Sequence, residues 1–169
     1  MQKAFPILLL SLITVFSSCS YYDHKTKQLF YDQLSGTNDS LDKMTDDWHQ
    51  MLEKAVASKS FAGLAPLRTK MGLFISRNRS KIANIEVPQN LEGLRDSEEV
   101  FLSNQANTIS EAYSTFEPYN DITPNEEIQN QLKLVVSDEE TESSASGAIR
   151  KSLQAFAQKN GLKVSQEIK

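Results

Sequence analysis

The stretch GLAPLRTKMGLFISRNRSKIAN, residues 63–84, decides the fold of this 169-residue chain. Its apolar residues recur every three or four positions, which is the spacing of one face of an α-helix. A proline at position 66 suits a first helical turn, where its missing N–H is not needed. We therefore predict an amphipathic helix over about 63–84, whose inner face carries Leu64, Leu67, Met71, Phe74, Asn78 and Ile82.

Three more segments carry the same period, at about 27–57, 91–116 and 124–160. Short turns separate them, and no stretch alternates like a β-strand over more than four residues. Four helices with apolar stripes and short turns are typical of bundles. We predict an all-α protein, an antiparallel four-helix bundle over residues 27–164, followed by a C-terminal tail of residues 165–169.

The ends of the fourth helix carry clear signals. Thr123 is expected to cap its start, with Pro124 in the first turn and Glu126 completing a capping box. Asn160-Gly161 is expected to end it, with Leu162 making the apolar contact of a C-cap.

One short segment and two single residues conflict with the helical pattern. Gly36-Thr37-Asn38 weakens the first helix and predicts a kink or a break there. Glu142 falls on the apolar seam of the fourth helix, so that helix either breaks near residues 137–147 or projects beyond its partners. The Ser-, Glu- and Gly-rich composition of residues 142–147 leaves both a frayed or kinked helix and a continuous one open. Asn78 lies in the seam of the second helix. It predicts either a buried amide paired across the bundle or a contact to a bound ligand.

Composition excludes several classes of protein. The chain has 18 Lys and Arg against 22 Asp and Glu, a net charge of −4, which argues against nucleic-acid binding because that needs a basic surface. A single cysteine excludes an internal disulfide framework and a cysteine-rich zinc site.

That cysteine, Cys19, follows a segment typical of an export signal. Lys3 precedes an apolar run from Ala4 to Phe16, and two serines follow the run. About 13 apolar residues make a helix of roughly 20 Å, short of the roughly 30 Å hydrocarbon core of a bilayer. We predict that residues 1–18 are a cleaved signal peptide.

The run Val15-Phe16-Ser17-Ser18-Cys19 resembles the lipobox of bacterial lipoproteins. That resemblance implies an acylated Cys19 thiol, a chain cut just before it, and a lipidated tether over residues 19–26. The residue after the cysteine is Ser20 and not Asp, which resembles Gram-negative lipoproteins that are sent to the outer membrane rather than retained in the inner membrane. The alternatives are an ordinary secretory signal, which leaves a free or disulfide-paired thiol, and a buried cysteine in a cytosolic protein.

Catalytic and metal-binding patterns are weak. Asp46, His49 and Glu53 share one helical face and could ligate a metal, although a solvated polar face is the alternative. The serines of residues 137–147 have no neighbouring histidine, and no glycine-rich phosphate loop is present. We therefore expect no enzymatic activity, no cofactor and no metal site.

Charge is distributed unevenly. Residues 59–85 contain six basic residues and no acid, whereas residues 86–121 contain eight acids and one base. The two interpretations are ion pairing between the basic second helix and its acidic neighbours, and a stripe that docks an anionic polymer or an acidic protein. The candidate stripe consists of Arg68, Lys70, Arg77, Arg79 and Lys81.

The signal ending at Cys19, the Pro118-Tyr119 turn and the closing stretch of residues 156–162 resemble a family of bacterial surface lipoproteins seen in spirochaetes. This resemblance and the absence of catalytic groups lead us to expect a lipid-anchored cell-envelope protein. It would sit on the periplasmic face of the outer membrane or on the cell surface, bound to the lipid bilayer through Cys19. There it would bind or scaffold a protein or an envelope polymer. The alternative is a small-molecule or metal carrier that uses the bundle core.

Overall fold

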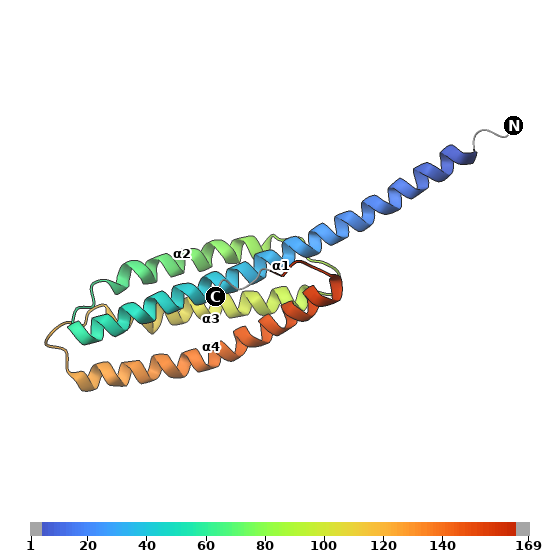
Figure 1. Ribbon diagram of the computed structural model, residues 1–169. Coiled ribbons are helices and arrows are strands. Elements are labelled where there is room, and N and C mark those ends of the chain that lie inside the picture. The colour runs from blue at the N-terminus through green and yellow to red at the C-terminus, as the bar shows by residue number, and fades with distance from the viewer. Residues whose placement is uncertain (1–4, 165–169) are drawn as a thin grey trace.

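The computed structural model describes residues 5–164, with the side chains of residues 22–164 other than residue 139. This part of the chain forms helices and no strands. Each helix packs against the next, and the last returns to the first, so the bundle is antiparallel (Figure 1). The predicted all-α four-helix bundle is confirmed. Its elements are α1 (Phe5–Ser58), α2 (Leu64–Ala83), α3 (Glu92–Glu111), the short 3₁₀-helix η1 (Tyr113–Phe116) and α4 (Asn125–Asn160).

Helix α1 is much longer than its partners. It begins at Phe5 rather than near residue 27, and its N-terminal part extends beyond the bundle (Figure 1). The backbone of the predicted tether, residues 19–26, is thus part of this helix. Residues 1–4, the predicted tail 165–169 and the side chain of Cys19 lie outside what the structure describes.

Within the described residues, no helix combines the length and the hydropathy that a membrane span requires.

The predicted weak point of α1 does not interrupt it. The helix is continuous through residues 36–38, and the side chains of Thr37 and Asn38 are buried in the bundle. Each of them donates a hydrogen bond to the carbonyl one turn earlier, to Gln33 and Leu34 respectively. Polar contacts therefore hold a segment whose intrinsic helix propensity is low, and the prediction of a break was wrong.

Aromatic side chains fill the end of the core where α1 meets η1. The rings of Trp48 and Tyr113 stack with centroids 3.6 Å apart, and Phe116 meets Trp48 edge-on at 6.0 Å. At the other end of the bundle, Phe30 of α1 meets Phe156 of α4 at 6.2 Å. Both ends of the core are therefore closed by packed rings.

The predicted cap is present at the C-terminal end of α4 but not at its N-terminal end. At the C-terminal end Leu162 donates to the carbonyl of Ala157 at 2.9 Å, which confirms the predicted cap. At the N-terminal end Pro124, not Thr123, occupies the cap position. The Thr123 hydroxyl instead accepts a hydrogen bond from the backbone N–H of Asn120. The preceding turn therefore uses the hydroxyl that was predicted to cap α4.

Gly161 gives a direct test of this C-cap. Its φ of +63° is a left-handed conformation that strains any residue with a Cβ. We expect Gly161→Ala to lower the free energy of unfolding by about 1 kcal/mol. Gly72→Ala is the matched control, since a Cβ at this helical position meets nothing within 4 Å and should raise stability by about 0.5–1 kcal/mol. Urea unfolding measures both changes in the free energy of unfolding. Changes of the same sign for the two variants would contradict the assignment of Gly161 as a left-handed C-cap.

Candidate functional site

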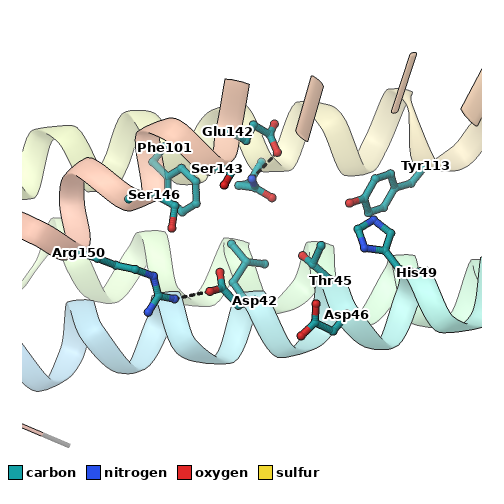
Figure 2. Close-up of a pocket in the computed structure, with 13 residues that line it drawn as sticks. Asp42, Thr45, Asp46, His49, Phe101, Tyr113, Glu142, Ser143, Ser146 and Arg150 are labelled. Carbon is teal, nitrogen blue, oxygen red and sulfur yellow. Dashed lines mark hydrogen bonds and ion pairs between the residues drawn. The ribbon is translucent and has the colours of Figure 1, made fainter. Parts of the chain in front are cut away.

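A polar cleft of about 430 Å³ lies between α1 and α4, with α3 behind it (Figure 2). Helix α1 contributes Asp42, Asp46 and His49, and α4 contributes Glu142 and Arg150. The remaining α4 side chains at this level are small (Ser143, Ser146 and Gly147). Small residues cannot fill the space between two helices, so the composition of α4 opens the cleft.

Glu142 shows how α4 remains continuous where its apolar seam is interrupted. The helix runs unbroken from Asn125 to Asn160, and the carboxylate of Glu142 accepts hydrogen bonds from Gln105 and Thr108 of α3. A break and a projecting segment are therefore both excluded, and the continuous helix, which the sequence left open, is the form that the structure has. Polar partners on the facing helix satisfy the charge at a seam position, as buried polar groups require.

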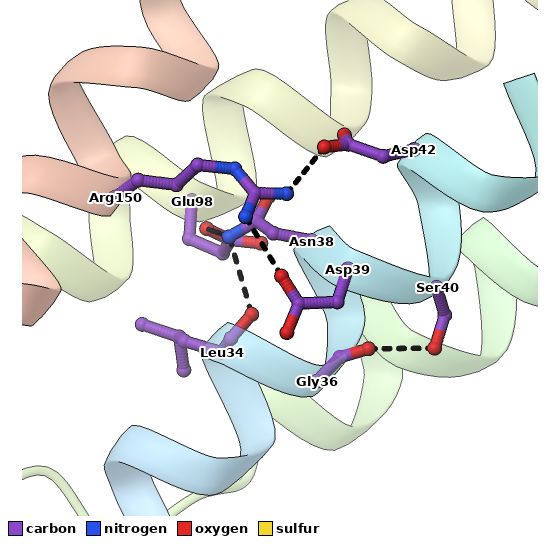
Figure 3. Close-up of polar contacts among 8 residues, drawn as sticks. All are labelled: Leu34, Gly36, Asn38, Asp39, Ser40, Asp42, Glu98 and Arg150. Carbon is purple, nitrogen blue, oxygen red and sulfur yellow. Dashed lines mark hydrogen bonds and ion pairs between the residues drawn. The ribbon is translucent and has the colours of Figure 1, made fainter. Parts of the chain in front are cut away.

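Arg150 closes one end of the cleft and ties α4 to α1. Its guanidinium donates to Asp39 at 2.7 Å and also to Asp42 (Figure 3). Burial raises the pKa of Asp42 above its ordinary value; Arg150 opposes the rise, and the neighbouring Asp39 and Asp46 add to it. One cation thus faces several carboxylates, and the cleft keeps an excess of negative charge.

A carboxyl group lies buried close to Arg150, on α3. Glu98 is completely inaccessible to solvent and accepts a hydrogen bond from Asn38 Nδ2 at 2.9 Å (Figure 3). Burial raises its pKa to about 7, although the Asn38 bond and the charge of Arg150 act in the opposite direction. Among the described residues, neither Glu98 Oε1 nor Asn38 Oδ1 has a hydrogen-bond partner. A protonated carboxyl would supply the donor that this pair lacks.

Glu98 is not among the candidate residues that the sequence pointed to. Glu98 and Glu99 are adjacent, and adjacent side chains on a helix point in different directions, so the pair does not form a converging carboxylate site. A signal was nevertheless present. Glu98 lies four residues after Leu94 and three before Phe101, so it falls on the apolar face of α3.

Asn78 is paired within the bundle. Its Oδ1 accepts a hydrogen bond from Gln33 Nε2 at 3.1 Å and lies 3.3 Å from the Thr37 hydroxyl, whose proton is donated to the Gln33 carbonyl. Its Nδ2 donates to the Phe74 carbonyl. These contacts join α2 to α1. The interpretation as a buried amide paired across the bundle is confirmed.

The candidate basic stripe divides into two groups. Arg68 is paired through two nitrogens with Glu117, which fits the ion-pairing interpretation. The other four members are exposed, and none forms an ion pair with another residue whose side chain is described. Docking of an anionic partner therefore stays a prediction for Lys70, Arg77, Arg79 and Lys81.

The three possible metal ligands do not converge. Asp46 lines the cleft and Glu53 lines a neighbouring groove, while half-buried His49 borders both and lies against the rings of Trp48 and Tyr113. Within the described part of the chain, no three His, Cys, Asp or Glu side chains are placed to hold one metal ion.

Comparison with known proteins gave no match to a family model, to a curated protein or to a solved structure.

Proposed function

We propose that this protein is a lipid-anchored binding module of the cell envelope, without catalytic activity, that engages a protein or an envelope polymer. The observation that carries this proposal is the order of elements along α1. A signal-like segment ends at Cys19, and the same helix continues into the bundle. The resemblance to lipoprotein signals and to surface lipoproteins of spirochaetes supports this proposal, and Ser20 favours the outer membrane.

The length of α1 suits such an anchor. Among the side chains described, from residue 22 on, the first that is completely buried is Phe30, which follows Cys19 by 11 residues, or roughly 16 Å of helix. Asp42 lies roughly 35 Å along α1 from Cys19. A helix standing upright on the bilayer would therefore present the cleft well away from the lipid, where an envelope component could reach it.

The anchor can be tested through Cys19. We expect Cys19→Ala to abolish acylation and to leave an unprocessed precursor, because the modified thiol is what the signal peptidase of lipoproteins requires. Globomycin should cause the same accumulation in the unaltered chain. Ser20→Ala is the matched control and should be acylated and processed normally. A Cys19→Ala chain that still fractionates with membranes at the mature mass would disprove the lipid anchor.

A second candidate function, a carrier of small molecules, is favoured by the cleft. Its volume falls within the roughly 300–1,000 Å³ of ordinary ligand pockets. The bundle core itself is filled by side chains such as Phe30, Trp48 and Leu102, so a ligand would bind between α1 and α4 rather than in the core.

A further inference from the structure

An apolar groove adjoins the polar cleft between the same two helices. It has a volume of about 490 Å³. Leu52 and Val56 of α1 and Leu132 and Val136 of α4 line it, and His49 borders both the groove and the cleft. The two hollows are therefore neighbours along one helix–helix seam. Several charged side chains line the cleft, whereas the groove is mostly apolar, with the carboxylate of Glu53 among its lining residues.

The polar half is arranged for a positive charge. Asp46 is exposed and has no ion-pair partner among the described residues, while Arg150 is already shared by two other carboxylates. The carboxylate of Glu142, which accepts hydrogen bonds from Gln105 and Thr108, borders the same cleft and adds a further negative charge to it. An added cation would relieve the repulsion among these groups, whereas an anion would add to it.

The apolar half is arranged for a hydrocarbon chain. Val136 is 54% exposed, although it is a large apolar residue beside a hollow. Covering such a surface is favourable by about 25 cal/mol per Å². From Asp46 to Val56 the seam runs roughly 15 Å along α1, which sets the length of the chain that it could cover.

We propose that this seam binds an amphipathic cation, with its ammonium group beside Asp46 and Asp42 and its alkyl chain between Leu52 and Val136. This inference rests on the second candidate function and names its ligand class. It is independent of the lipid anchor, because the groove lies within the bundle.

Titration calorimetry on the purified full chain tests the proposal with three probes. Decylamine carries both features, decanoate carries the same chain with the opposite charge, and butylamine carries the charge with little chain. We expect decylamine to bind at one site at least tenfold more tightly than either of the other two. Equal affinities for decylamine and decanoate would overturn the proposal, since they would show that charge plays no part.

Four variants locate the site. Asp46→Asn and Val136→Ser should each weaken decylamine binding about fivefold, the first through lost charge and the second through lost apolar area. The matched controls are Asp47→Asn, an exposed neighbour outside the cleft, and Val100→Ser, an exposed valine on α3. Neither should alter binding. Unchanged binding by both Asp46→Asn and Val136→Ser would place decylamine elsewhere and refute the site.

A second copy of the chain is the competing occupant. Light scattering would detect it as a dimer that Val136→Ser returns to a monomer, and that result would refute the ligand proposal. Failure of either experiment leaves the lipid anchor unaffected, because Cys19→Ala tests that part separately.

Discussion

Between pH 5 and pH 8 we expect the free energy of unfolding of the bundle to fall by about 2–3 kcal/mol because of Glu98 alone. The folded protein holds this carboxyl with a pKa of about 7, against an ordinary value of 4.5. Between these two values the folded state binds more protons than the unfolded state. Stability therefore decreases as the pH rises through this window, and the loss levels off above about pH 8.

The physical reason is the surroundings of the group. Glu98 lies on the inner face of α3, where ionisation places a charge out of contact with water. Among the residues whose side chains are described, Asn38 alone donates to it, and Arg150 is engaged with Asp39 and Asp42. The compensation is too small to offset burial, so the neutral acid is the form that the fold prefers.

Glu98→Gln separates this group from the other titrating residues. A glutamine keeps the shape, accepts from Asn38 Nδ2 and offers a donor to the unpartnered Asn38 Oδ1. Urea unfolding at several pH values should find this variant more stable than the unaltered chain at pH 8. Its free energy of unfolding should also lack the decrease with pH that is assigned to Glu98. Glu99→Gln, at the half-exposed next position, should keep the slope. If the free energies of unfolding of the unaltered chain and of Glu98→Gln changed in parallel with pH, the prediction would be contradicted.

The helices could be predicted from the sequence because hydrophobic period is a property of one segment at a time. Most of the inner face of α2 follows from spacing, although Ile75 is buried there and the predicted Leu67 and Phe74 are only half-buried. The end of α4 at Gly161 follows from a residue with special backbone freedom. The start of α1 did not follow. No glycine or proline lies between Pro6 and Gly36, so nothing in that stretch stops a helix. The predicted start near residue 27 depended on the expected tether over residues 19–26, which is an inference about function and not about backbone conformation.

The candidate site could be predicted only in part, because it depends on which residues of different helices lie at the same level once the helices are packed. Glu98 and Glu142 both occupy seam positions, which the spacing shows. Their partners, Asn38 on α1 and Gln105 on α3, become neighbours only when the helices are packed. The cleft has the same origin, since small residues of α4 lie opposite acidic residues of α1. A single helix pattern cannot show this relation.

Trp48 should contribute most to stability among the core side chains, and we expect Trp48→Ala to lower the free energy of unfolding by about 3–5 kcal/mol. The side chain is completely buried, it stacks on Tyr113, and its loss would leave a cavity between α1 and η1. Closely packed neighbours cannot collapse fully into such a space, so both burial and contact are lost.

Trp48→Phe makes this prediction specific to packing. The indole Nε1 is buried and has no hydrogen-bond acceptor among the described residues, so the native side chain bears an uncompensated desolvation cost. Phenylalanine removes that donor while keeping a ring beside Tyr113, and it should cost at most about half as much as alanine. Urea unfolding followed by circular dichroism measures both, because the variants lack the only tryptophan. Leu29→Ala, at an exposed position on α1, should change stability by no more than about 0.5 kcal/mol. Equal losses for the phenylalanine and alanine variants would mean that the indole nitrogen has a partner and that a hydrogen bond, rather than ring packing, holds this end of the bundle.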